Sequence, residues 1–236
     1  MIDRAASADP IVRSLLAAHP KVSVVEESAN PGVDFRIGAW ERAVEIGNPN
    51  HEVAGLVELI DNNPMVCADR MSVADPLSTL ALVALGPLAW AGMILERPTV
   101  LSSFEGDEQL LDSFLATAGW EEGAIQYTEA KDLGTVLAVT AMAEIATPSE
   151  WSEIDDLYDE RFSRSFFVRR EEDADWDPSL VASKPYAVYR LRYTPGDDRS
   201  LLTVHVLADR EGKCGPAQAV HAMNVMAGFE ESLGVA

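Results

Sequence analysis

The sequence predicts an α/β protein of the α+β kind, in which helices pack on a mixed β-sheet. A helix followed by a strand spans 10–25, an order typical of α/β domains. Two alternating segments within 186–207 flank the turn Pro195–Asp198, which predicts a β-hairpin. A strand then leads into 215–228, where apolar residues recur at three- and four-residue spacing and predict a buried helix.

The first elements lack a phosphate loop. Asp9-Pro10 predicts a helix start with proline in the first turn, His19-Pro20 predicts its end, and 21–25 is β-prone. A dinucleotide-binding unit begins with a strand and a Gly-rich turn before that helix, but residues 1–8 contain no glycine. Backbone approaches a pyrophosphate closely only where Cβ atoms are missing, so no phosphate site is expected here.

The middle of the chain alternates between strand and helix patterns. The helix starting at Pro76 has Asp75 as its N-cap and is apolar on most sides, which predicts burial. The expected elements are, in order, an extended segment at 34–36, a strand at 41–46, a β-prone segment at 53–60, a turn at 61–64, a helix at 76–88, a strand at 98–102, a helix at 106–120, a strand at 133–146 with helix as the alternative, a helix from Thr147 through Tyr158, and a strand at 165–169.

The composition excludes several classes of function. With 18 Lys+Arg and 39 Asp+Glu the formal charge is −21, so the surface repels nucleic acid and anionic lipid, and neither is an expected partner. Two cysteines give neither a disulfide framework nor a metal cluster, and His221 and Asn224 lack a third ligand, so no metal is expected. The N-terminus does not resemble a signal peptide, and we expect a cytoplasmic protein.

Specific residues in the last predicted helix and the loop before it resemble a known signature. The pattern Asp209-x3-Lys213-x4-Gln218-Ala-Val-x2-Met-Asn224-x-Met-x-Gly-x-Glu230 is similar to the C-terminal signature of N-acetyl-γ-glutamyl-phosphate reductases, relatives of the aspartate-semialdehyde dehydrogenases. Further matches occur in the family's order. They are Asp34–Arg36 (D-F-R), Gly55–Leu59 (G-L-P-E-L), Asp75-Pro76 with the helix to Leu88, Phe167–Arg169 (P-F-V-R) and Ser183-Lys184 (T-K).

This resemblance implies a division of the chain. Residues 1–74 would be the remnant of a Rossmann-like unit without its Gly-rich loop. Residues 75–212 would form the mixed-sheet, semialdehyde-dehydrogenase C-terminal-type domain, which serves for dimerisation in the family. Residues 213–236 would form a C-terminal helix that packs back on the N-terminal region.

The departures from the family lie at its chemistry. The family's nucleophilic cysteine sits at the N-terminus of the helix that here begins Pro76-Leu77-Ser78, and its catalytic histidine has no counterpart between His51 and His205. Thioester-forming hydride transfer needs a thiolate, an acid/base and a positioned nicotinamide. The favoured hypothesis is therefore a catalytically degenerate relative, without cofactor, that acts by homodimerisation, by pairing with a full-length relative or by ligand binding. The alternative is an active NAD(P)-dependent oxidoreductase with a rebuilt site, which would use NADP.

Five residues are candidates for a retained or rebuilt site. Cys67 and Ser78 are the catalytic candidates, although a plain thiol and a helix cap are the simpler interpretations. Lys213, Gln218 and Asn224 are the cofactor-binding candidates, because the resemblance places their segment beside the family's cofactor. Core packing of a buried helix is the alternative for these three.

The excess of acidic residues predicts a dependence of stability on salt. Self-repulsion among carboxylates is screened at high ionic strength, so the free energy of unfolding should rise from low to molar salt. Urea unfolding at several KCl concentrations measures this. Constant stability across the series would contradict adaptation to high salt.

Overall fold

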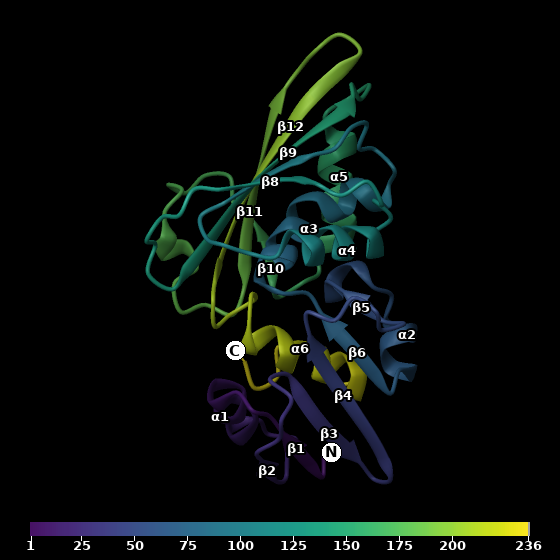
Figure 1. Ribbon diagram of the computed structural model, residues 1–236, viewed down its shortest axis with the longest axis vertical. Helices are drawn as coiled ribbons and strands as arrows, with labels where there is room; N and C mark the ends of the chain where they lie inside the picture. The colour runs from purple at the N-terminus through teal and green to yellow at the C-terminus, as the bar shows by residue number, and fades with distance from the viewer. Residues whose placement is uncertain (236) are drawn as a thin grey trace.

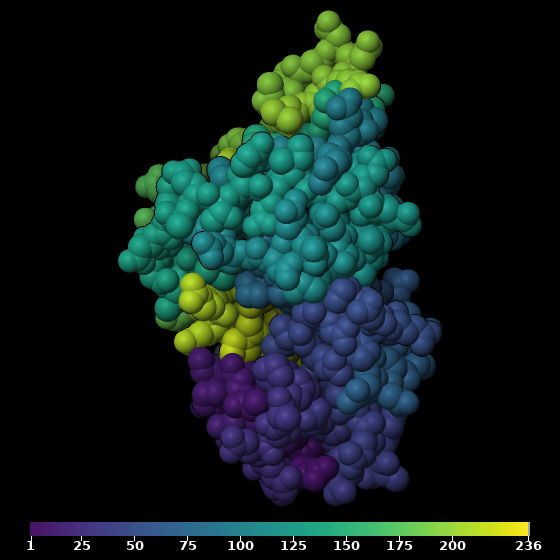
Figure 2. All heavy atoms as spheres, viewed as in Figure 1, coloured from purple at the N-terminus to yellow at the C-terminus, as the bar shows by residue number. Residues whose placement is uncertain are grey.

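Two six-stranded mixed β-sheets lie along the long axis of the computed structural model, which describes residues 1–235 (Figure 1). The helices gather on one face of each sheet, which confirms the predicted α/β class. Each sheet has its own hydrophobic core. Figure 2 shows the C-terminal segment lodged between the two halves of the molecule.

The first sheet is built mainly from the N-terminal third of the chain, with strand order β2-β1-β3-β4-β6-β5. β3 alone runs against its neighbours, and the other pairs are parallel. Its strands are β1 (Arg4–Ala6), β2 (Val25–Glu26), β3 (Val33–Ile37), β4 (Trp40–Ile46), β5 (Ala54–Gly55) and β6 (Arg70–Val73). The 3₁₀ turn η1 (Val57–Leu59) follows β5.

One face of this sheet is covered by α1 (Pro10–Ala18), α2 (Asn62–Cys67) and α6 (Pro216–Ala227). Alternation along β3 directs Val33 and Phe35 into the core with these helices and leaves Asp34 on the other face. Met223 and its apolar neighbours on α6 belong to the same core, although almost 200 residues of sequence separate β3 from α6.

The second sheet has strand order β10-β11-β12-β9-β7-β8. The long β9 and β12 pair antiparallel along their whole length at its centre. Its strands are β7 (Thr99–Ser102), β8 (Ile125–Thr128), β9 (Val136–Ala146), β10 (Val168–Arg170), β11 (Ala187–Thr194) and β12 (Arg199–Asp209). The helices on it are α3 (Pro76–Trp90), α4 (Glu108–Thr117) and α5 (Ser152–Phe162), and the 3₁₀ turn η2 (Pro178–Leu180) lies before β11.

Helix α3 forms the centre of the second core. It is apolar on almost every side, and it packs between α4, α5 and the strands β9 and β12. Tyr158 of α5 is fully buried against it and donates its hydroxyl to the carbonyl oxygen of Ala84. This fixes α5 across α3 and satisfies a polar group that is expensive to bury alone.

Several elements differ from the sequence prediction. Residues 61–64 were expected to form a turn but begin α2, since Pro64 lies in the first turn, where no N–H is needed. In the β-prone segment 53–60 only Ala54–Gly55 form a strand, and Val57–Leu59 form η1. The 21–25 strand shrinks to β2 plus a single bridge at Val22. Helix α5 begins after Trp151, not at Thr147, whose hydroxyl bonds the β11–β12 turn. Strands β1, β6 and β8 were not predicted, being three or four residues long.

Within residues 1–235 there is no helix with both the length and the apolar character needed to cross a membrane.

Candidate functional site

The turn from β1 to α1 stands where a Rossmann fold holds a pyrophosphate. Here the Asp9 carboxylate accepts hydrogen bonds from the N–H groups of Ile11 and Val12, at 2.7 and 3.1 Å. These are the free N–H groups that would otherwise bind a phosphate. A phosphate placed there would meet a carboxylate of the same charge, so the helix terminus is closed to anions.

Arg13 closes the same turn from the other side. Its guanidinium donates to the carbonyl oxygens of Ser7 and Ala8, at 2.9 and 2.7 Å. The Ser7 side chain is buried and contacts the chain near Pro31. The residues present therefore do not fit the pyrophosphate of NADP at this turn.

The N-terminus of α3 is the position that the resemblance assigns to a nucleophile. Asp75 caps the helix by accepting from the N–H of Leu77 at 3.2 Å. Leu77, Ser78 and Thr79 are completely buried. Gly106 lies directly on Leu77, so close that a Cβ atom on this glycine would stand 2.6 Å from the Leu77 side chain. The loop before α4 thus covers Leu77, while Asp75 and Pro76 at the start of the helix remain partly exposed.

Three buried polar atoms near this terminus have no hydrogen bond of good geometry within residues 1–235, although the Ser78 side chain lies close enough to Asp75 to lower its pKa. They are Asp75 Oδ1, Ser78 Oγ and Gln218 Oε1. The Gln218 amide donates to the carbonyl oxygen of Ala74 at 3.0 Å and to the Thr79 hydroxyl at 3.1 Å. Burial raises the pKa of Asp75 above its usual range. The structure therefore places two candidates, Ser78 and Gln218, at the start of α3, where Gln218 bonds to Ala74 and Thr79 and Ser78 lies beside Asp75.

No histidine accompanies them. All four histidines of the chain have polar contacts elsewhere. The Asp75 carboxylate, whose pKa is raised by burial, is therefore the titratable group that lies beside the Ser78 hydroxyl.

Cys67 lies apart from this group, at the exposed end of α2 on the first sheet. Beside it, the buried Arg42 of β4 donates to the carbonyl oxygen of Ala68 and to that of Met226 in α6. The structure does not bring the thiol and Ser78 together.

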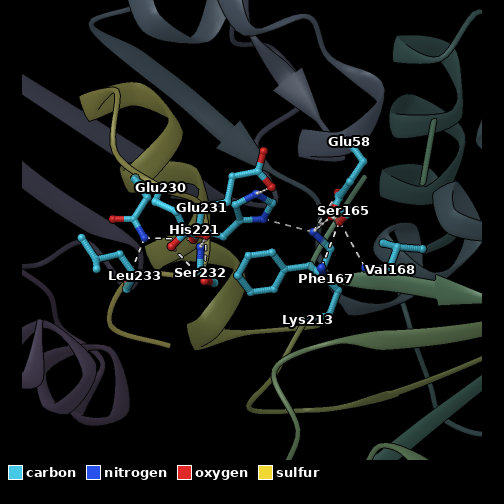
Figure 3. Close-up of polar contacts among 11 residues, drawn as sticks. Glu58, Ser165, Phe167, Val168, Lys213, His221, Glu230, Glu231, Ser232 and Leu233 are labelled. Carbon is cyan, nitrogen blue, oxygen red and sulfur yellow. Dashed lines mark hydrogen bonds and ion pairs between the residues drawn. The ribbon is translucent and has the colours of Figure 1, made fainter. Parts of the chain in front are cut away.

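Lys213 is fully buried where the two halves of the molecule meet (Figure 3). Its ammonium lies 2.8 Å from both carboxylate oxygens of Glu58, whose side chain is 3% exposed. Ser165, from the loop between α5 and β10, donates to the same carboxylate at 3.0 Å. Burial alone would raise the pKa of Glu58, but the neighbouring ammonium holds it below its usual range.

His221 of α6 extends this cluster toward solvent. Its Nδ1 lies 3.5 Å from the Lys213 ammonium, and its Nε2 lies 3.3 Å from a carboxylate oxygen of Glu231. The Phe167 ring stacks on the imidazole at 4.0 Å between centroids. Burial, and then the charge of Lys213, lowers the pKa of His221.

Asn224 has an intramolecular partner for each polar atom of its side chain. Its Nδ2 donates to the carbonyl oxygens of Glu231 and Leu233, and its Oδ1 lies 2.9 Å from Nε2 of His19. Because His19 Nδ1 accepts from the N–H of Lys21, its Nε2 carries the proton and donates to Asn224. The side chain ties the C-terminal tail to α6 and α1.

Sequence reasoning missed most partners in these clusters. Glu58 stands inside the matched Gly55–Leu59 motif, and its pairing with Lys213 joins two of the matched motifs. Ser165 and Glu231 gave no signal, since neither belongs to a periodic pattern. Within residues 1–235 no group of three or more His, Cys, Asp or Glu is placed to hold a metal. A cavity of about 490 Å³ opens on the first sheet beside Arg4, but none of the five candidates lines it.

Comparison with known proteins identifies the fold of this chain. The sequence matches no family model and no curated protein. The structure is similar to aspartate semialdehyde dehydrogenase II from Vibrio cholerae, with a TM-score of 0.66, 10% identity, and coverage of 96% of this chain and 98% of that chain. The same enzyme complexed with ASA gives a TM-score of 0.64 at 11% identity, with the same coverage. The chain has the aspartate semialdehyde dehydrogenase fold. This confirms the predicted architecture of a Rossmann-like unit joined to a mixed-sheet domain of semialdehyde-dehydrogenase type.

The buried ion pair predicts a large difference between single and double substitutions. Lys213→Met leaves the Glu58 carboxylate unpaired and should lower the free energy of unfolding by about 3–5 kcal/mol. Adding Glu58→Leu removes the orphaned charge and should restore most of the loss. Urea unfolding measures both. Arg4→Met, at an exposed ion pair, is the control and should cost less than about 1 kcal/mol. A double variant as unstable as the single one would contradict this account.

Proposed function

We propose that this protein is a catalytically degenerate relative of the semialdehyde dehydrogenases that acts through association with a second copy of itself. The C-terminal signature points to N-acetyl-γ-glutamyl-phosphate reductases as the particular relatives. A full-length reductase is the other partner that the resemblance suggests.

One observation carries the loss of catalysis: both helix termini that the family's chemistry requires are capped by the chain's own carboxylates. Asp9 occupies the N–H groups of α1, and Asp75 occupies that of α3. A thiolate nucleophile and a cofactor phosphate both rely on such termini. In this chain neither terminus is free to stabilise a second negative charge.

The alternative is an active NAD(P)-dependent oxidoreductase with a rebuilt site. The unpaired polar atoms of Asp75, Ser78 and Gln218 favour it, because unsatisfied buried groups recur at functional sites. The burial of Ser78 and the packing of Gly106 on Leu77 oppose it, since no substrate reaches a buried hydroxyl.

Titration with NADPH separates the two functions. We expect no saturable change in nucleotide fluorescence up to about 1 mM, beyond the range in which enzymes normally bind their substrates. Oxidation of NADPH should equal that of a Cys67→Ser variant, since Cys67 lies apart from α3. Saturable binding, or turnover that disappears on Cys67→Ser, would establish the alternative.

The second sheet's face opposite its helices supports self-association where the segment around η2, which packs on Val188 and Leu207, leaves it open. Alternation places Tyr127 and Ile125 of β8 on this face, 59% and 38% exposed, and Leu201 of β12 joins them at 38%. Among the outward side chains that are not buried, Glu144 is the only acid, and Arg199 pairs with it at 2.9 Å. Two chains of charge −21 can approach each other only through such a region.

The uncovered face of the first sheet differs in chemistry. Arg4 bridges Glu26 and Glu41, and Arg70 pairs with Glu45. Side chains that neutralise one another across strands are typical of a solvated sheet face. The contrast favours the second sheet as the contact between copies.

Light scattering after size exclusion tests this surface. The wild-type chain should have twice the chain mass, and Tyr127→Glu should weaken association at least tenfold by placing carboxylates in the contact. Val24→Glu, at an apolar residue exposed on the first half of the molecule, should leave the mass unchanged. A wild-type chain that is monomeric and does not bind a full-length reductase would contradict the proposal.

A further inference from the structure

The cluster around Lys213 is the polar junction between the two halves of the molecule. Glu58 comes from η1 beside the first sheet, and Ser165 comes from the loop that enters the second sheet. Lys213 and His221 come from the segment that returns from the second sheet to the first. Among residues 1–235 the pair Lys213–Glu58 is the ion pair in which both side chains are buried. The hydrophobic cores on either side form separate clusters, and Leu56 and Leu59, which flank Glu58, pack in the core of the second half.

The protonation state of His221 is fixed by its neighbours. The charged groups that face it are Lys213 at Nδ1, Glu231 at Nε2, and Glu58 behind the lysine. Phe167 covers the ring without a charge. Because an ammonium offers only protons, Nδ1 must carry a lone pair and Nε2 must carry the hydrogen. A second proton would therefore enter at Nδ1 and point directly at the ammonium.

That proton would act on the whole junction. An imidazolium repels the Lys213 ammonium, removes one of its acceptors and competes for Glu58. The Glu231 side chain is 41% exposed, and its carboxylate is the negatively charged group on the solvent side of the protonated imidazole. A charged His221 is best accommodated when it moves toward the tail and solvent.

We propose that His221 is the proton-sensing element of a latch that fastens the two halves of the molecule together. In the neutral state the imidazole accepts a hydrogen bond from the Lys213 ammonium. This bond keeps the lysine on Glu58, and the junction stays closed. Protonation in mildly acidic solution turns that acceptor into a competing cation, and α6 with the first sheet moves away from the η1 turn, which stays packed on the second half. This inference does not depend on the proposed function.

The direction of the pH effect follows from the environment of His221. Its pKa in the closed form lies below the ordinary value of 6.5. The contribution of the neutral ring to the closed form is therefore complete above about pH 6.5 and is lost as the pH falls through the lowered pKa. His19 also has a pKa lowered by burial, but it lies within the first core, away from the junction.

Distance measurement between two spin labels tests the latch. The exposed Cys67 reports the first half of the molecule, and Ser113→Cys on α4 supplies an exposed site on the second, while Cys214 is buried. Between about pH 7.5 and pH 5 the distance distribution of the otherwise wild-type chain should broaden and lengthen. His221→Asn keeps an acceptor oxygen near Nδ1 but has no proton to gain, and its distribution should stay closed throughout.

Two further variants complete the design. His19→Asn removes the other buried imidazole and should leave the opening in place. Glu231→Gln removes a carboxylate that stabilises the charged ring in the closed form, so its opening should shift to higher pH. This variant alters an accessible side chain and also serves if His221→Asn does not fold. The latch would be overturned if the wild-type distance distribution did not change with pH. It would also be overturned if the opening persisted in His221→Asn, or if the pH of opening were the same in Glu231→Gln as in the wild-type chain.

Discussion

The ion pair between Lys213 and Glu58 is the contact on which the arrangement of the two sheets depends. An ammonium and a carboxylate, both buried, are tolerable only together, because either one alone would carry an uncompensated charge in a medium that does not solvate it. Since the partners come from opposite ends of the chain, their pairing fixes where the C-terminal segment returns to the first sheet. Helix α6 and the tail then follow from that point, with Asn224 holding the tail on α6.

Much of the fold could be predicted from the sequence because its signals are local. Asp75-Pro76 caps and starts α3, Asp9-Pro10 does the same for α1, and the hairpin of β11 and β12 has clear alternation around its turn. The elements that escaped prediction are held by their neighbours. β6, for example, is four residues long and forms only because β4 and β5 flank it on either side.

The candidate site was harder to predict because its meaning depends on contacts between distant residues. Lys213, Gln218 and Asn224 were identified from one signature, yet the structure gives them three different sets of partners: Glu58, the α3 terminus and the tail. No periodicity predicts which of these each residue will meet. The partners Ser165 and Glu231 lie in irregular segments, where sequence carries little structural signal.

The two capped helix termini link the stability of the fold to the proposed loss of catalysis. A free helix N-terminus is useful to an enzyme because its N–H groups have no acceptor in the chain and can bind an anion. Until the anion binds, these unsatisfied N–H groups lower the stability of the helix. The carboxylates of Asp9 and Asp75 accept hydrogen bonds from these N–H groups as N-caps. Each helix is stabilised at its start, and the N–H groups are no longer available to an external anion. Gly106 then admits a loop close enough to Leu77 to cover its side chain. Under the proposed function, the same caps that stabilise α1 and α3 would keep a cofactor phosphate and a reacting carbonyl from these two termini.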